Sequence, residues 1–356
     1  MEDVQRWLDS GEQHIVLATV IKTYRSAPRP AGSKMAIRAD GRITGSISGG
    51  CVESAVIEES LRLSAHLPPR ILHFETADER AWEVGLPCGG SIDVLVERLN
   101  VQHFQSLREK LLLNERAVAV TITRGPEKLL GEKIAFSRSG EPLGSAQTPL
   151  FERLVRAARN QTSSAIVDIG DGLEAFVDVF PPATTLVIVG GVHIGVALAR
   201  LAKIVGYRTV VIDPRKTFGN AERFPEVDRL MPVWPDEAYA MMELTSETAV
   251  AVLTHDPKLD DPALAGALRS PVFYVGALGS ARAQAQRRKR LLQLGFSETE
   301  LARIHGPIGL DLRAATPEEI GLSVLSEIVA LARGADEVLS KRAATKLQKN
   351  HFLVDR

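Results

Sequence analysis

A glycine-rich segment in the second half of the chain carries residues that could bind an anionic cofactor. It reads Gly190-Gly191-Val192-His193-Ile194-Gly195, follows a short apolar run and opens a segment of helical length. Asp213 ends the next apolar run, 23 residues after Gly190, as the ribose partner in a dinucleotide site does. Val192 stands where a glycine would let the backbone approach a pyrophosphate, and this disfavours NAD(P). The alternative is a Rossmann-type fold that binds another ligand or none.

A second candidate segment is Thr254-His255-Asp256, which follows another apolar run. In a doubly wound sheet the first and fourth strands flank the ligand crevice, so we expect His193 and His255 to face one cavity. Histidine can ligate a metal, exchange a proton or hydrogen-bond a polar cofactor. The alternative is a structural His255 that caps its own turn through Asp256.

A third turn, Gly276-Ala277-Leu278-Gly279-Ser280, follows the next apolar run and opens a helix, where free backbone N–H groups could meet an anion. Most basic residues of the segment 282–290 are expected on a solvated face, although Arg282 is close enough to the turn to help bind phosphate. The cofactor-binding candidates of this half are Gly190, Gly191, His193, Gly195, Asp213, His255, Asp256, Gly276, Gly279 and Ser280.

Both cysteines of the chain lie beside paired glycines in the first half. Cys51 falls at the expected start of a helix, where the dipole and free N–H groups attract anions, and Cys88 precedes a strand. The alternative is that both are small buried residues in tight turns. Because there is no C-x-x-C, a structural zinc site is not expected. The candidates here are Ser48, Gly49, Gly50, Cys51, Cys88, Gly89 and Gly90.

Alternating apolar runs and helical segments must position the candidates of the second half. The runs read as strands buried on both faces of a parallel sheet, which predicts a Rossmann-like, doubly wound α/β fold. The expected strands are 186–189, 209–212, 249–253 and 272–275. The expected helices are 194–205, 236–244, 262–268, 281–294 and 317–332.

The first half predicts a separate α+β domain. Strands are expected at 14–22, 34–38, 71–75 and 92–96, with a helix at 51–64. A strand-rich extension over about 101–180 adds strands at 117–123, 133–136, 165–169 and 175–179 and a helix near 151–160. Pro181-Pro182 marks the boundary, so the expected domains are 1–182 and 183–335, followed by a charged tail at 336–356.

Composition limits the classes of partner. The 356 residues carry a formal net charge of -1, so no overall field favours nucleic acid or an anionic membrane. The longest uncharged stretch, Pro181 to Ala199, contains glycines and a histidine and is better interpreted as a strand, a turn and a helix than as a membrane span. The acidic, polar first residues and only two cysteines favour a cytoplasmic setting.

These segments together resemble the XdhC/CoxI family, the accessory proteins of xanthine dehydrogenase-type molybdenum hydroxylases. The resemblance spans roughly residues 12–332. Val192 departs from the family's usual glycine turn, and Arg313 stands where a small residue is expected. The matching segments are 27–35, 45–53, 87–90, 190–195, 253–261, 276–280 and 307–311.

The resemblance implies a chaperone that binds molybdenum cofactor, as molybdopterin or its dinucleotide form, and protects it during sulfuration by a cysteine desulfurase. It also implies delivery of the cofactor to a xanthine dehydrogenase-type apo-hydroxylase. Such a cofactor needs backbone N–H groups for its phosphate, polar groups for its pterin edge and a soft ligand for its metal. On this hypothesis Cys51 and Cys88 contact the molybdenum or sulfur end, and the Rossmann crevice holds the pterin. Two domains meeting across a cleft would also suit a homodimer.

Two other classes of function stay open at this stage. An NAD(P)-dependent oxidoreductase would use Gly190, Gly195 and Asp213, but the chain has no recognisable catalytic pair. A thiol redox or sulfur-transfer enzyme would use Cys51 and Cys88 as a resolving pair. No catalytic residue is predicted, and the resemblance to the XdhC/CoxI family favours a maturation factor over an enzyme.

Overall fold

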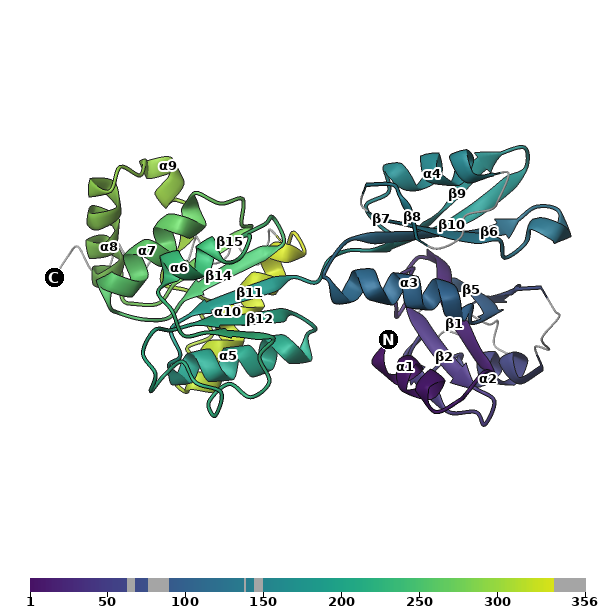
Figure 1. Cartoon of the computed structure of the whole chain (residues 1–356), viewed down its shortest axis with the longest axis horizontal. Helices are drawn as coiled ribbons and strands as arrows, with labels where there is room; N and C mark the ends of the chain where they lie inside the picture. The colour runs from purple at the N-terminus through teal and green to yellow at the C-terminus, as the bar shows by residue number, and fades with distance from the viewer. Residues whose placement is uncertain (63–67, 76–89, 138, 144–149, 336–356) are drawn as a thin grey trace. The chain divides into compact units, whose positions relative to one another are not determined.

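The chain forms two compact units, the first over Met1–Pro182 and the second beginning at Ala183. The structure is a computed structural model and describes residues 1–62, 68–75, 90–137, 139–143 and 150–335. Figure 1 shows the elements of both units. None of the helices in these ranges is long and apolar enough to cross a membrane.

The second unit contains a six-stranded sheet in the order β13-β12-β11-β14-β15-β16. Every neighbouring pair in this sheet is parallel. The order reverses between β11 and β14, as in a Rossmann fold, so a crevice is expected at the carboxyl ends of these two strands. The strands are β11 (Thr185–Val189), β12 (Arg208–Ile212), β13 (Arg229–Met231), β14 (Thr248–Val252), β15 (Tyr274–Ala277) and β16 (Ile304–His305).

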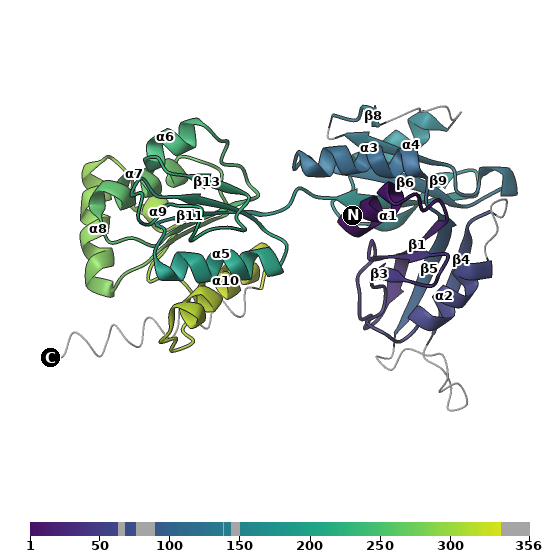
Figure 2. The same cartoon turned by 60° about the horizontal axis from the view of Figure 1, so that its bottom comes forward.

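Helices cover both faces of this sheet, which explains why its central strands are apolar without alternation. Figures 1 and 2 show α5 (His193–Ile204) and α10 (Pro317–Ala332) side by side on one face, where they bury Leu198 and Val324. The opposite face packs α7 against residues such as Val250 and Val252. Its helices are α6 (Pro235–Ala240), α7 (Pro257–Leu268), α8 (Ala281–Gln293) and α9 (Glu298–Leu301).

The first unit contains two antiparallel five-stranded sheets. The first sheet has the order β3-β2-β1-β5-β4 and is covered on one face by α2, which buries Val56 against it. Helix α1 (Glu2–Asp9) packs Val4 with Ile15 of β1 in a smaller cluster. The elements are β1 (Ile15–Tyr24), β2 (Lys34–Arg38), β3 (Ile43–Gly45), α2 (Glu53–Arg62), β4 (Arg70–Phe74) and β5 (Ser91–Arg98).

The second sheet of this unit has the order β8-β7-β6-β10-β9. Phe176 of β10 packs with Ile21 and Leu95 of the first sheet, and Lys34 pairs with Asp178 between the same two sheets. The two sheets are thus joined by apolar and ionic contacts. The elements are α3 (Val101–Leu112), β6 (Ala117–Arg124), a 3-10 turn (Glu127–Leu129), β7 (Lys133–Ser137), β8 (Pro142–Leu143), α4 (Phe151–Arg159), β9 (Ala165–Gly170) and β10 (Leu173–Phe180).

The predicted fold class is confirmed: a Rossmann-like parallel sheet follows an α+β region. The sequence missed the short edge strands β13 and β16, each two or three residues long, because so few residues show no periodicity. It also placed the start of α7 at Pro262, whereas this helix begins at Pro257, where Asp256 caps it by accepting from the Lys258 N–H at 3.0 Å.

Candidate functional site: a crevice in the Rossmann unit

A cavity of about 730 Å³ opens at the carboxyl ends of β11 and β14. This is the point of the sheet where its strand order reverses, the usual ligand position in an open α/β sheet. The volume lies within the range of small-molecule sites. The lining residues are Val192, His193, Ile194, Arg215, Leu253, Thr254, His255, Asp256, Pro257, Leu278 and Pro317.

His193 and His255 both line this cavity, one from the start of α5 and the other from the loop after β14. Both side chains are exposed. Neither imidazole makes a hydrogen bond or ion pair with any residue that the structure describes. The helix cap beside His255 is made by Asp256 itself, so the His255 side chain is available to a ligand.

The glycine turn between β11 and α5 is held from inside the protein. A Cβ on Gly190 would lie 2.4 Å from Thr254 Cγ2, and one on Gly195 would lie 2.6 Å from the Gly190 carbonyl oxygen. Gly190 also has a φ of +110°, a backbone conformation that glycine adopts at little cost. These two glycines let β11, α5 and β14 pack closely.

Asp213 is fully buried and directs its carboxylate at this turn. Its Oδ2 accepts the Gly191 N–H at 2.7 Å, and both oxygens accept from the Arg215 guanidinium, at 2.9 and 2.7 Å. Burial raises the pKa of Asp213, but the hydrogen bonds from Arg215 and Gly191 outweigh it and lower the pKa overall. Asp213 is therefore an internal clamp, and its oxygens are already engaged where a ribose would need them.

The loop after β12 lies directly on the same turn. A Cβ on Gly191 would lie 2.3 Å from the Phe218 carbonyl oxygen. Arg223 of this loop donates to the Gly191 carbonyl oxygen at 3.0 Å. The chain itself thus occupies the space beside Gly191, and a pyrophosphate could reach the turn there only if the loop moved.

A buried polar network ties the loop after β14 to the turn after β15. The Thr254 hydroxyl donates to Asp260, and Arg287 pairs with Asp260 at 2.7 Å and donates to the Leu278 carbonyl oxygen at 3.0 Å. Burial raises the pKa of Asp260 despite these partners. The sequence predicts that most basic residues of 282–290 lie on a solvated face, and Arg282, Arg288 and Lys289 are exposed. Arg287 is an exception, since its side chain is 4% exposed.

The predicted turn over residues 276–280 has a structural role. Ser280 caps α8 by accepting from the Ala283 N–H at 3.3 Å, and a Cβ on Gly276 would lie 2.6 Å from Ile308. A Cβ on Gly279 would come 3.9 Å from His255 Nδ1. Of this turn, Leu278 is the residue that lines the cavity, and the sequence did not single it out.

In the first unit, the glycine-rich turn before Cys51 binds a carboxylate of the same chain. Glu53 of α2 accepts the backbone N–H groups of Ile47, Ser48, Gly49 and Gly50, at 2.9 to 3.2 Å. Burial raises the pKa of Glu53, but hydrogen bonds from the Ser48 hydroxyl, the Ser48 N–H and the Ser46 hydroxyl outweigh it, and the pKa falls to about 2. The N–H groups that we expected to attract a ligand therefore already have an acceptor within the chain.

The two cysteines differ in what the structure describes of them. Cys51 follows this turn and is a half-buried free thiol, and its N–H donates to the Ser48 hydroxyl at 3.0 Å. Cys88 and Gly89 lie outside the described residues. Gly90 is described and packs tightly, since a Cβ there would lie 2.4 Å from the Ser26 carbonyl oxygen. In the described ranges no three His, Cys, Asp or Glu side chains form a group that could hold a metal ion.

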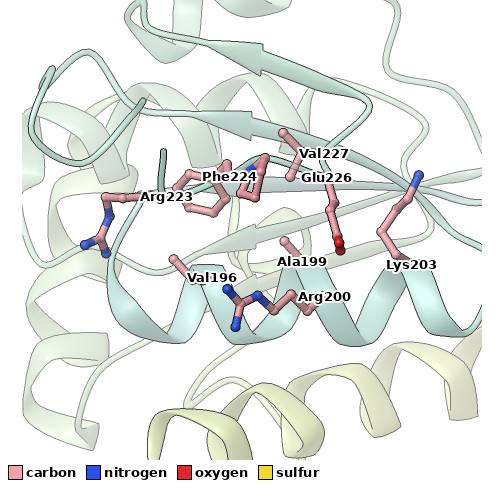
Figure 3. Close-up of a pocket in the computed structure, with 9 residues that line it drawn as sticks. Val196, Ala199, Arg200, Lys203, Arg223, Phe224, Glu226 and Val227 are labelled. Carbon is pink, nitrogen blue, oxygen red and sulfur yellow. The ribbon is translucent and has the colours of Figure 1, made fainter. Parts of the chain in front are cut away.

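Two further hollows flank α5. One, of about 580 Å³, lies between α5 and α10 and shares His193 and Pro317 with the main cavity. The other lies where α5 faces the loop 223–227, and Figure 3 shows Arg200 and Lys203 of α5 opposite that loop. With about 10 Å³ it could hold one water molecule at most. The crevice at β11 and β14 is thus the best candidate site.

A Rossmann-like parallel sheet with a crevice at its reversal point, preceded in the chain by an α+β unit, defines a class of two-unit α/β proteins. The family model of the XdhC Rossmann domain matches residues 186–328, and that of the XdhC and CoxI family matches residues 7–75. These two matches cover more than half of the 356 residues. The chain belongs to the XdhC/CoxI family.

Individual relatives agree with this assignment. The chain is 28% identical over 324 residues to a probable xanthine dehydrogenase subunit of Bacillus subtilis, and the match covers 89% of this chain and 93% of the relative. It is 29% identical over 323 residues to the molybdenum cofactor insertion chaperone PaoD of Escherichia coli, over 90% of this chain and 85% of the relative. A crystal structure of a xanthine dehydrogenase from Bacillus halodurans has the same fold, with a TM-score of 0.77 at 24% identity over 93% of this chain and 95% of that one.

Proposed function

We propose that this protein binds molybdenum cofactor and assists its insertion into a xanthine dehydrogenase-type molybdenum hydroxylase. The observation that carries the proposal is the cavity at β11 and β14, where two unengaged imidazoles and one guanidinium line a largely apolar wall. The name of the relative PaoD, a molybdenum cofactor insertion chaperone, supports the same role. The name of the Bacillus subtilis relative supports a partner of the xanthine dehydrogenase type.

The lining of the cavity fits the organic part of this cofactor. Leu253, Leu278 and Pro257 offer apolar surface to a flat ring, while the histidines offer hydrogen bonds to the ring's polar edge. Arg215 offers a cation to a phosphate. When bound, the cofactor would supply the redox chemistry of the partner enzyme, and this chain would hold it and shield it from solvent.

The same geometry argues against the NAD(P)-dependent oxidoreductase. Such an enzyme needs an acidic acceptor for the ribose and an open glycine turn for the pyrophosphate. Here Asp213 is engaged by Gly191 and Arg215, and Phe218 lies on the turn. The second alternative, a thiol redox or sulfur-transfer enzyme, needs Cys51 and Cys88 to act as a pair.

The decisive experiment is cofactor retention by the full chain. Purified protein is incubated anaerobically with molybdenum cofactor and desalted, and bound molybdenum and pterin are measured, with NADH and NADPH tested in parallel. We expect about one pterin per chain and no nicotinamide binding. A His193→Ala/His255→Ala variant should lose most of the pterin, whereas His73→Ala, an exposed histidine of the first unit, should keep it. Tight nicotinamide binding without pterin would overturn the proposal.

The role of the thiols is a finer part of the proposal. Cys51 and Cys88 are proposed to contact the molybdenum or its sulfur ligand. A Cys51→Ala/Cys88→Ala variant should therefore retain less molybdenum than wild type, and wild-type retention would refute the contact. A count of free thiols with and without reductant addresses the alternative of a redox pair, which requires loss of both thiols on oxidation.

The partners beyond the hydroxylase are also part of the proposal. A cysteine desulfurase would sulfurate the held cofactor, and a homodimer would suit a carrier. Co-purification with the desulfurase and light scattering of the purified chain test these two points. A strictly monomeric chain that activates the apo-hydroxylase would refute the dimer and leave the carrier role intact.

A further inference from the structure

Arg215 is the one cationic side chain that lines the cavity at β11 and β14 among the described residues, and the protein fixes it from two sides. Its Nε and Nη2 donate to the two oxygens of Asp213, a bidentate arrangement. Its guanidinium carbon lies 4.3 Å from the centroid of the Phe218 ring. Because the side chain is already ordered, a ligand would lose little entropy in binding to it.

The engaged guanidinium still has donors left for a ligand. An arginine has five N–H groups, and only those on Nε and Nη2 are used by Asp213. Nη1 makes no hydrogen bond to any described residue, and the side chain is 38% exposed. These free donors, on a cavity wall, match the oxygens of a phosphate.

The other charged group on the cavity wall is Asp256. Its carboxylate would repel an anion, but its Oδ1 accepts the Lys258 N–H at 3.0 Å at the start of α7. It is therefore partly neutralised by the helix dipole and by its own hydrogen bond. The hydrogen bond to Asp213 is the main cause of the raised pKa of Arg215, and the charge of Asp256 adds to it, so both carboxylates act on the guanidinium.

The glycine turn cannot serve as the anion site in the usual way. The Gly191 N–H already donates to Asp213, and the Phe218 carbonyl oxygen lies against Gly191. The clamp that closes the turn is the same group that orients Arg215. With the Gly191 N–H engaged, the cationic donor that remains on the cavity wall is Arg215, which follows β12.

We infer that Arg215 recognises the phosphate of a phosphorylated pterin, with Asp213 as its positioning residue, and that a nicotinamide dinucleotide is excluded from the glycine turn. The inference rests on the proposed function, since it names the group that selects the ligand at the same cavity. It assigns a specific chemical task to a residue that the sequence motifs did not mark.

Two fluorescent probes test the inference on the full chain: 6-hydroxymethylpterin and its monophosphate ester. The ratio of their dissociation constants isolates the phosphate contribution from the ring contribution. Wild type should bind the ester about 10- to 100-fold more tightly, the range of a charge-assisted hydrogen bond. Arg215→Gln should reduce this ratio to about 1 and leave the affinity for the alcohol unchanged.

Matched variants separate charge from geometry. Arg215→Lys keeps the charge but loses the fork, so its ratio should fall between those of wild type and Arg215→Gln. Arg200→Gln removes an exposed arginine of α5 that lines the neighbouring hollows but not this cavity, and it should keep the wild-type ratio. NADH at millimolar concentration should displace neither probe.

The outcomes distinguish this inference from the proposed function. If wild type prefers the ester and Arg215→Gln keeps that preference, the phosphate lies elsewhere and the inference is wrong, while pterin binding stands. If NADH displaces the ester competitively, the exclusion is wrong. If wild type binds neither pterin probe nor molybdenum cofactor, the proposed function fails and the inference falls with it.

Discussion

Two glycine-rich turns of this protein precede helices, one before α2 and one before α5. They differ in how their backbone N–H groups are used. The turn before α2 directs four backbone N–H groups at its own Glu53. The turn before α5 gives one N–H group, that of Gly191, to Asp213 and borders a cavity of about 730 Å³. A glycine-rich turn therefore predicts a cluster of N–H donors, but whether the acceptor is a ligand depends on a carboxylate elsewhere in the chain.

The largest effect should follow removal of the carboxylate from the first turn. Glu53→Ala leaves the N–H groups of Ile47, Ser48 and Gly50 without their acceptor, while the Gly49 N–H keeps the Ser46 hydroxyl. We expect the free energy of unfolding of the first unit to fall by about 3 to 4 kcal/mol. Urea unfolding followed by hydrogen exchange of peptides from each unit measures this loss where it occurs. The second unit should be unaffected.

A control on the same helix sharpens this test. Glu58→Gln alters an exposed carboxylate of α2 that pairs with Arg62, and such a surface pair contributes about 0.5 kcal/mol or less. A loss for Glu58→Gln as large as that for Glu53→Ala would show that helix charge, and not the turn, governs stability.

The acid dependence of the first unit should reveal the same carboxylate. The pKa of Glu53 is about 2 in the folded chain, against an ordinary value of 4.5, so its contribution is complete above pH 4.5 and is lost as the pH falls towards 2. The difference corresponds to about 3 kcal/mol, discounted for partial exposure of the turn to solvent. Unfolding of wild type and Glu53→Gln at pH 7 and pH 3 measures it. If the two proteins lose equal stability between these pH values, the carboxylate is not the cause.

These contacts explain which parts of the fold and of the candidate site could be predicted from the sequence. It predicted the Rossmann crevice because strand runs, a glycine turn and polar residues at strand ends are all local signals. It did not predict Arg215, whose task depends on the buried Asp213 two residues earlier and on the Phe218 ring, nor the pairing of Arg287 with Asp260, 27 residues apart. An aspartate-proline turn after β12 followed by an arginine was the signal that could have drawn attention to Arg215.

A smaller effect, on ligand binding, should come from Asp213, which holds the turn before α5. Asp213→Asn keeps the shape of the side chain but removes the charge that orients Arg215, so we expect the ester-to-alcohol binding ratio of the pterin probes to fall about 5-fold. The affinity for the unphosphorylated pterin should change little. A merely structural role would weaken both probes equally. Asp236→Asn, an exposed position in the first turn of α6, serves as the control.

The smallest effect concerns the loop before α10, where an arginine has a backbone conformation that favours glycine. Arg313 has a φ of +54°, in the left-handed region, at the position where the family pattern predicts a small residue. The left-handed backbone costs a non-glycine residue about 1 to 2 kcal/mol, and glycine avoids this cost but loses part of the gain through its unfolded-state entropy. Arg313→Gly should therefore stabilise the second unit by about 0.5 kcal/mol in urea unfolding.

Arg313→Ala separates backbone from side chain at this position. It removes the guanidinium but keeps a Cβ in the left-handed region, so it should give no gain in stability. Equal stabilisation by alanine and glycine would mean that the arginine side chain, and not its backbone, is unfavourable. If Arg313→Gly stabilises the second unit and Arg313→Ala does not, the backbone of Arg313 is strained. The loop before α10 would then differ from the turns before α2 and α5, which have glycines.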